Sequence, residues 1–396
     1  MLIGRNLSLL LITTAVGACG GGGGAPAADA PDDGFDRHAL LQHLSTNVLL
    51  PHAEVFASTV AALPAAIGAY CDALDAGTPA TTLADARTAW GASIDAWQRI
   101  EANLIGPPSM DQNTLRDRIY GWPLLSTCGI DRDTAASWAS PATYDVAARL
   151  TNVRSLAAIE FLLFTTDTAH SCATTPTGWD ALGADLPRAR CRQALAIATD
   201  VAAQGQVVAT AWRATGGNYV GELAEAGTAA SSIPSAQEGV NRVSDGLYYV
   251  DKMVKDMKLA ESAGIADNAC GTVGTPCDRE IELRYADRAT QAIRINLASL
   301  REVFTGTTAT SDGPGFDDFL RATGNAEIAD RMTASLDNAI AKAAALPDSF
   351  VTALATDYQK VVDAHVAIVA FTDDLKSQFL TVLALEIPDD VAADND

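Results

Sequence analysis

Residues 37–74 read RHALLQHLSTNVLLPHAEVFASTVAALPAAIGAYCDAL, and this stretch decides the fold. Apolar side chains return every three or four residues, the spacing that places them on one face of an α-helix. The face consists of Leu40, Leu44, Val48, Val55, Val60 and Leu63. We therefore predict a helix over 37–74, bent or split at Pro51 and Pro64, because proline cannot donate a hydrogen bond within a helix.

The remaining chain repeats this pattern. Of its 396 residues 48% are hydrophobic but only 6% are aromatic, so alanine supplies much of the apolar content and favours helices. No segment alternates with the period of two that is typical of strands. The sequence therefore predicts an all-α protein built of helical bundles. The expected helices cover about 83–104, 142–164, 186–214, 236–262, 279–305, 326–345 and 349–385, whereas 109–140 is expected to be irregular and 165–177 to be a loop.

This number of helices is too large for one four-helix bundle. We therefore predict two tandem bundles related by an internal duplication, with the functional site between them. The break is expected at 216–234, giving an N-terminal bundle over 36–216 and a C-terminal bundle over 217–396. Three pairs of identical residues support the duplication, each at the same offset along the chain: Arg87 and Arg288, Ile94 and Ile295, and Glu101 and Glu302.

The N-terminus, MLIGRNLSLLLITTAVGAC, has the features of an export signal over 1–18. One arginine precedes an apolar run too short for a permanent membrane helix, and the run ends in small residues before Cys19. We predict a lipoprotein acylated at Cys19 and tethered by 19–35, whose Gly/Pro/Asp composition suits a spacer. Gly20 favours the outer membrane of the cell envelope. The alternative is an ordinary secretory signal cut near Ala18.

Six further cysteines make an even number, which in an exported chain favours three disulfides over free thiols. The alternative, a thiolate metal site, lacks the short C-x₂-C spacing of zinc ribbons. Proximity along the chain favours the pairs Cys270–Cys277, Cys172–Cys191 and Cys71–Cys128.

Charge and missing motifs exclude several functions. With 27 Lys and Arg against 49 Asp and Glu, the net charge is −22, which repels phosphate backbones and argues against nucleic-acid binding. A small anionic ligand could still bind at a local basic site. The sequence contains no nucleophile elbow, His-Glu-x-x-His, Walker loop or dinucleotide fingerprint.

Several stretches, taken in order, form a recognisable series: NVLLPHAEVFASTVAAL (47–63), AWGASIDAWQRIEANLIGP (89–107), GWPLLSTCGID (121–131), SLAAIEFLLF (155–164), EIELRYADRA (280–289) and LALEIPDDVAADND (383–396). In this order they resemble the imelysin family, which includes iron-regulated protein A and an insulin-cleaving membrane peptidase. The resemblance covers nearly everything after the tether and implies an envelope protein linked to iron.

The chain departs from the family at its signature, Gly-x-His-x-x-Glu. The matching positions hold Ser155, Ala157 and Glu160, so only the glutamate remains. A histidine and a glutamate three residues apart share a helix face and could bind one metal, whereas alanine offers no ligand. The family resemblance implies iron or another divalent metal as a cofactor. Ala157 weakens this implication, because it removes one expected ligand. His52 is expected to be a capping or surface residue, and the alternative is a position near the bundle core.

The remaining candidate pocket residues are mainly carboxylates. Glu160 stands among apolar residues, so it is either buried with a partner or raised pKa, or solvated on a narrow polar stripe. Glu101 and Asp131 also fit solvated positions. Arg284 either pairs with Glu280 one helical turn away or crosses between the bundles to neutralise carboxylates. The candidate ligand or metal pocket is Glu101, Asp131, Glu160, Glu282 and Arg284.

The sequence-based hypothesis is therefore an imelysin-like envelope lipoprotein that binds a metal, a chelate or a polymer segment without catalysis. Its expected partners are the membrane, through the lipid on Cys19, and envelope iron-uptake proteins. The alternatives are a structural scaffold with a vestigial cleft and a metallopeptidase, which would need a metal-bound water and a general base.

Overall fold

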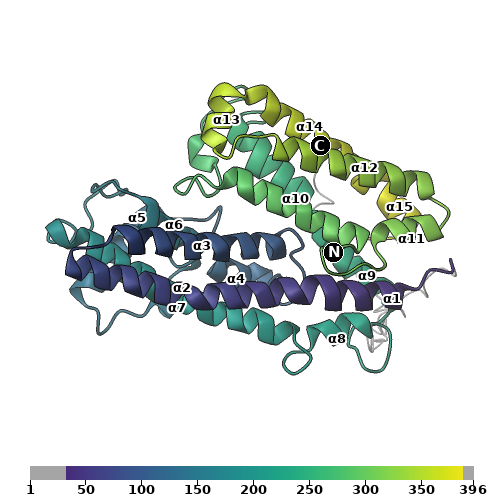
Figure 1. Cartoon of the computed structure of the whole chain (residues 1–396), viewed down its shortest axis with the longest axis horizontal. Helices are drawn as coiled ribbons and strands as arrows, with labels where there is room; N and C mark the ends of the chain where they lie inside the picture. The colour runs from purple at the N-terminus through teal and green to yellow at the C-terminus, as the bar shows by residue number, and fades with distance from the viewer. Residues whose placement is uncertain (1–32, 387–396) are drawn as a thin grey trace, which may run out of the picture.

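The structure, a computed structural model, describes residues 33–386. The predicted signal over 1–18, Cys19, most of the tether and the acidic end of the chain lie outside these residues, so their assignments stay predictions. Residues 33–386 are mainly helical and contain no strand. The predicted all-α class is therefore confirmed. Figure 1 shows two layers of helices, with α1–α8 in one and α10–α15 in the other.

The N-terminal bundle is built around one long helix. α2 packs along its length against α3 and α7, and α6 closes the bundle against α7. The run 37–76 is the one helix among residues 33–386 that could span a membrane by length and composition, but its packing on α3 and α7 is that of a bundle helix. The elements are α1 (Arg37–His43), the π-helix η1 (Leu44–Leu49), α2 (Leu50–Ala76), α3 (Ala80–Glu101), α6 (Leu156–Phe164) and α7 (Leu186–Trp212).

Two expectations about the first helix were wrong. The helix is not split at either proline: η1 runs directly into α2 at Pro51, where a π-helical turn precedes the proline, and α2 continues through Pro64 without ending. Val55, which was expected on the buried face, is 51% exposed, because one helical face cannot hold it together with the rest of the set.

Short elements fill the segment between α3 and α7. The stretch 109–140, expected to be irregular, contains α4 (Met110–Ile119) and α5 (Thr127–Ala139), and Ser126 caps α5 by accepting a hydrogen bond from Gly129 N. The helix expected over 142–164 is formed only in α6, which begins after its cap Ser155. The 3₁₀ turns are η2 (Val146–Ala148), η3 (Thr151–Val153) and η4 (Gly183–Asp185), and α8 (Tyr219–Ala224) follows α7.

The C-terminal bundle is more interrupted than expected. It comprises α9 (Ala236–Leu247), the π-helix η5 (Val250–Glu261), α10 (Ala289–Thr305), α11 (Phe316–Ala322), α12 (Ala326–Ala344), α13 (Phe350–Thr356), α14 (Tyr358–Asp374), the π-helix η7 (Leu375–Phe379) and α15 (Leu380–Leu383). The single helix expected over 349–385 is therefore interrupted at Asp357, and from Tyr358 it continues through α14, η7 and α15. α12 and α14 pack together, and α10 packs on both α12 and α3.

The segment 278–288, which we call the strap, was wrongly expected to be helical. Only a 3₁₀ turn, η6 (Asp278–Glu280), forms in it, and α10 starts at Ala289. Leu283 and Asp287 adopt φ angles of 50° and 52°, in the left-handed region that ends regular helix. The strap is fixed by tertiary contacts rather than by its own helical preference.

One hydrophobic core runs through both bundles, from Leu40 to Leu385. Because α3 and α10 contact each other across the junction, the bundles form a continuous packed unit. The predicted boundary at 216/217 and the internal duplication stay predictions.

Three disulfides form, as the even number of cysteines indicated, but two of the predicted pairs were wrong. Cys71 pairs with Cys191, Cys128 with Cys172 and Cys270 with Cys277. The packing of α2 on α7 brings Cys71 to Cys191 across 120 residues, so helix contacts override proximity along the chain.

Candidate functional site

A buried ion pair lies where the two bundles meet. Lys258 on η5 and Glu282 on the strap have side chains fully removed from solvent, with Nζ 2.9 Å from Oε1. The Lys258 ammonium also donates to Gln98 Oε1 at 2.9 Å and Asn296 Oδ1 at 2.6 Å. Tyr120 donates its hydroxyl hydrogen bond to Glu282. Helices α3 and α10, η5 and the strap are thus joined through one cation.

A second buried pair lies beside the first. Glu101, the last residue of α3, accepts hydrogen bonds from Arg116 Nε at 2.8 Å and Nη2 at 2.5 Å. Burial raises the pKa of Tyr120 and Tyr249 well above the usual value, and the neighbouring carboxylates raise it further. Burial also lowers the pKa of Lys258, although Glu282 opposes that shift. We call these residues, with Gln98 and Asn296, the junction cluster.

Glu160 is buried on α6 and binds the backbone of the strap. Its Oε1 accepts hydrogen bonds from the backbone N–H groups of Tyr285 at 2.9 Å and Ala286 at 3.0 Å. Burial raises the pKa of Glu160 from 4.5 to about 8, although both backbone donors oppose the shift. The carboxyl group is therefore mostly neutral at pH 7, and of the two interpretations of Glu160, the buried one holds.

A cavity of about 290 Å³, which we call the cleft, opens between α6, η5 and the strap. Glu160 and Ala157 form one wall, and Arg284 lies opposite on the strap. The Arg284 guanidinium donates to Tyr285 Oη at 2.5 Å and lies over that ring, 4.6 Å from its centroid. Burial and the charge of Glu280 raise the pKa of Glu261. Other lining residues are Trp122, Met257, Glu261, Arg279, Glu280 and Tyr285.

The predicted pocket residues divide into three groups. Glu160 and Arg284 line the cleft, and Glu101 and Glu282 lie in the junction cluster. Asp131 is not among the residues that line the cleft.

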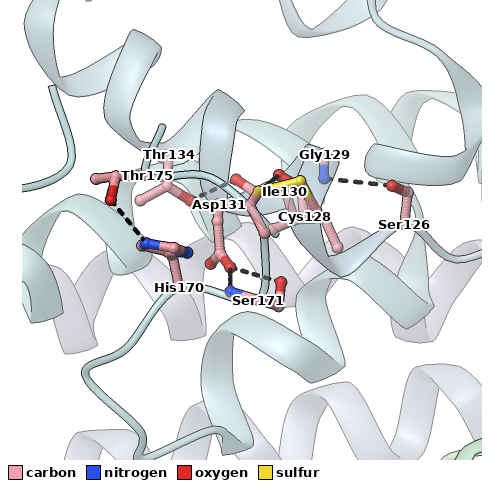
Figure 2. Close-up of a disulfide and its surroundings, with 10 residues drawn as sticks. Ser126, Cys128, Gly129, Ile130, Asp131, Thr134, His170, Ser171 and Thr175 are labelled. Atoms are coloured by element: carbon pink, nitrogen blue, oxygen red, sulfur yellow. Dashed lines mark hydrogen bonds between the residues drawn. A yellow bond between two sulfur atoms is a disulfide. The ribbon is translucent and has the colours of Figure 1, made fainter. Parts of the chain in front are cut away.

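Asp131 instead anchors a loop within the N-terminal bundle. Its Oδ2 accepts hydrogen bonds from Ser171 N and Ser171 Oγ, both at 2.7 Å, next to the Cys128–Cys172 disulfide (Figure 2). The solvated interpretation of Asp131 is wrong, because the residue is 1% exposed, and its pocket role stays a prediction.

Other side chains also lie differently from expectation. Arg284 does not pair with Glu280 along a helix, because the strap is irregular there, and Glu280 Oε1 accepts from Ala269 N instead. His52 is buried rather than superficial, with Nε2 2.9 Å from Glu302 Oε2. In the predicted duplication Glu302 is the counterpart of Glu101. The two carboxylates therefore have different partners.

Sequence reasoning missed Lys258, Gln98, Asn296, Tyr120 and Arg116, the partners of the predicted carboxylates. Lys258 lies in a stretch with two other lysines, Lys252 and Lys255, so nothing in the local pattern separates it from a solvated side chain. The one usable signal was indirect, because buried carboxylates need partners and the chain has only 27 cationic residues of Lys and Arg to supply them.

The residues present do not suit a protein-held metal ion in the cleft. Ala157 offers no donor atom, and Glu160 uses one oxygen on two backbone N–H groups. Within residues 33–386 no group of three His, Cys, Asp or Glu side chains could hold a metal.

Fold and site together define a class: all-helical proteins of two packed bundles with a polar cleft at their junction. The family model for imelysin matches residues 49–378, most of the chain. The chain belongs to the imelysin family.

Two solved structures share this fold. An imelysin-like protein from Psychrobacter arcticum 273-4 is 18% identical with a TM-score of 0.67, covering 89% of this chain and 96% of that one. A structure described as that of an iron-regulated protein A precursor from Parabacteroides distasonis ATCC 8503 is 17% identical with a TM-score of 0.69, covering 91% of this chain and 96% of that one. No curated protein matches.

Proposed function

We propose that this imelysin-family chain is a non-enzymatic binding protein of the cell envelope, anchored through a lipid on Cys19, whose cleft takes iron as an anionic chelate. The chemistry of the cleft wall carries the proposal. It offers two arginines and the largely neutral Glu160, and residues 33–386 hold no group of three His, Cys, Asp or Glu side chains for a bare ion. A chelate brings its own ligands and presents oxygens to the protein.

Charge and protonation support an anionic ligand. Arg279 and Arg284 are the cations of the cleft wall, in a chain whose net charge of −22 would otherwise repel anions. Glu160 is mostly neutral at pH 7, so its carboxyl group can donate a hydrogen bond to an acceptor oxygen instead of repelling it. A guanidinium suits carboxylate groups because its planar N–H donors match two oxygens.

The link to iron and to uptake rests on the family. The structural neighbour from Parabacteroides distasonis carries the name iron-regulated protein A precursor. By this proposal, the chain delivers the chelate to envelope iron-uptake proteins.

The test is calorimetric titration of the purified chain with ferric citrate, and separately with ferrous and zinc ions. We expect ferric citrate to bind and the free ions not to bind. Arg284→Ala should weaken ferric citrate binding at least about tenfold, the loss expected for a charge-assisted contact. Arg301→Ala is the matched control, because Arg301 is a half-exposed residue of α10 that pairs with Asp337 and lies outside the cleft.

The Glu160→Gln variant distinguishes binding of an iron chelate from binding of a free metal ion. A glutamine keeps a neutral group that donates a hydrogen bond, so chelate binding should persist within about threefold. Stoichiometric binding of a free ion that Glu160→Gln abolishes would instead establish a metal site. Absence of all binding would favour the scaffold, and cleavage of a denatured protein that a chelator stops would favour the peptidase.

A further inference from the structure

The Cys270–Cys277 disulfide lies directly before the strap, and it differs from the other two disulfides in what it connects. It joins cysteines 7 positions apart, whereas the other two bonds span 120 and 44 positions. A disulfide restricts the unfolded chain less when the loop that it closes is short, so this bond contributes least to stability. The fold can therefore lose the Cys270–Cys277 bond more easily than either of the others.

Access from solvent also distinguishes this disulfide. Cys270 is exposed, and its partner Cys277 is fully buried. In the other two pairs every cysteine is buried or half-buried. Thiol–disulfide exchange starts when a thiolate reaches a sulfur atom, so access decides which bond reacts and which sulfur is attacked. Among the paired cysteines, Cys270 is the one most open to attack.

Two residues of the cleft wall bind the chain at the position before Cys270. Arg279 donates from Nη2 to Ala269 O, and Glu280 Oε1 accepts from Ala269 N at 2.8 Å. Both side chains line the cleft. The disulfide ties the residue after Ala269 to Cys277, which lies two positions before Arg279, so it keeps the two segments together. The position of one of the two cleft arginines thus depends on this bond.

The two halves of the disulfide are held differently by the rest of the chain. Cys277 N donates to Ser262 O at 2.9 Å, just after η5, so the buried half has an anchor besides the sulfur. The exposed half is held by neutral hydrogen bonds, such as that from Asn268 Nδ2 to Glu261 O at 2.8 Å. Water competes for such bonds on an exposed loop, so they contribute little once the covalent bond is gone. When the disulfide opens, Cys270 moves and Cys277 stays.

The later part of the strap does not depend on the disulfide. Glu160 accepts from the backbone N–H of Tyr285, and Glu282 pairs with Lys258. Opening the disulfide therefore frees the start of the strap, which carries Arg279, and leaves its later part in place.

We propose that Cys270–Cys277 is a redox-sensitive site, at which a dithiol protein of the thiol–disulfide oxidoreductase class opens the disulfide and weakens anion binding in the cleft. A thiolate of the reductant attacks Cys270 Sγ, the bond between the two cysteines breaks, and Cys277 leaves as a thiolate that takes up a proton. The second thiolate of the reductant then displaces Cys270 from the mixed disulfide, and Cys270 is protonated in turn. The chain gains two thiols, and the dithiol becomes a disulfide.

The consequence for the cleft follows from the contact between Arg279 and Ala269. Once Ala269 moves away with Cys270, the Arg279 side chain is no longer held in place, so an anion that binds it must first order it. The effect on anion binding rests on the proposed function, whereas the exchange reaction does not.

The first test is limited reduction of the full chain with dithiothreitol, followed by acid quenching, labelling of the free thiols in urea and mass spectrometry. We expect Cys270 and Cys277 to be labelled at least about tenfold faster than the other paired cysteines, because access controls the rate. Hydrogen exchange should then be faster at 278–281 and unchanged at 284–286. Earlier labelling of another pair, or unchanged hydrogen exchange at 278–281, would overturn the proposal.

The second test compares two variants that each lack one disulfide. Cys270→Ser/Cys277→Ser should bind ferric citrate at least about threefold more weakly than the wild type and unfold at a similar urea concentration. Cys71→Ser/Cys191→Ser is the matched control, because this bond joins α2 to α7 and neither cysteine lines the cleft. The control should unfold at a clearly lower urea concentration and, while folded, bind ferric citrate as the wild type does.

The two tests separate this proposal from the proposed function. If the wild type binds ferric citrate and Cys270→Ser/Cys277→Ser binds it equally well, the disulfide does not control the cleft and the proposal is wrong. If the wild type does not bind ferric citrate, the proposed function fails. The order of reduction and the hydrogen exchange then still decide whether Cys270–Cys277 is a redox-sensitive site.

Discussion

Lys258 at the junction of the bundles and Arg190 on α7 are both cations removed from water, and they differ in their surroundings. Lys258 has a carboxylate partner and two amide acceptors, contributed by the strap, α3 and α10. Arg190 has one hydrogen-bond acceptor within the described chain, the backbone oxygen of Asp167, and lies over the Trp179 ring with the charges of Asp131 and Asp167 acting through space. The comparison teaches that one buried cation joins helices through direct hydrogen bonds, whereas the other is held mainly by charges and a ring around it.

Removing the junction cation gives the largest expected effect. Lys258→Met leaves Glu282 buried without its cation, and the free energy of unfolding should fall by about 3–5 kcal/mol. The measurement is urea unfolding followed by circular dichroism. Lys360→Met is the control, because Lys360 is half-exposed, pairs with Asp357 and should change stability by less than about 1 kcal/mol.

The double variant sharpens this result. Adding Glu282→Gln removes the uncompensated charge and keeps groups that can bond to Tyr120 and Gln98, so most of the lost stability should return. If Lys258→Met unfolds at the wild-type urea midpoint, the junction cluster does not hold the bundles together.

The titration of Glu160 should have an intermediate effect on the free energy of unfolding, and this effect depends on pH. Its pKa rises from 4.5 in the unfolded chain to about 8 in the folded protein, so the folded state binds more protons between these values. The contribution of Glu160 to stability is then fully present below about pH 4.5 and is lost as the pH rises through about 8. Between about pH 5.5 and 8.5 the loss should be roughly 3 kcal/mol, at about 1.4 kcal/mol per pKa unit.

Glu160→Gln should remove this part of the pH dependence, since an amide does not titrate. Urea midpoints of both proteins at the two pH values give the difference. Asp317→Asn is a useful comparison, because burial raises the pKa of Asp317 to about 6 and its variant should alter the profile only at lower pH. Parallel profiles for wild type and Glu160→Gln would show that Glu160 is ionised.

Arg190→Gln gives the smallest expected effect on stability. The variant loses one hydrogen bond to Asp167 but also a buried charge with two unmade hydrogen bonds, so the free energy of unfolding should change by less than about 1 kcal/mol. Thermal unfolding of the variant and the wild type measures this. A loss comparable to that of Lys258→Met would make Arg190 a structural residue like Lys258.

The long helices could be predicted from the sequence, because periodic apolar residues such as Leu40, Leu44 and Val60 need only local geometry to share a face. The strap and the segment before α6 could not, because their composition still favours helix while tertiary contacts impose another conformation. The hydrogen bonds from Tyr285 and Ala286 to Glu160 illustrate this, since they join residues 125 and 126 positions apart.

The candidate site could be predicted only in part. Glu160 stood out because a carboxylate among apolar residues is unusual, and Glu282 and Arg284 came with the resemblance. Lys258 and Arg190 did not stand out, because one of several nearby lysines or arginines becomes special only when the fold buries it. The burial of Asp131 could not be predicted for the same reason, since its loop partner Ser171 lies 40 residues away.

The connectivity of the N-terminal cysteines has a consequence for making this protein. The Cys128–Cys172 bond is nested inside the loop closed by Cys71–Cys191. An oxidant that joined thiols in the order in which the ribosome delivers them would link Cys71 to Cys128. Exchange through mixed disulfides would then be needed to reach the native pairs, so production of the intact chain depends on an isomerase or a thiol buffer as well as on an oxidant.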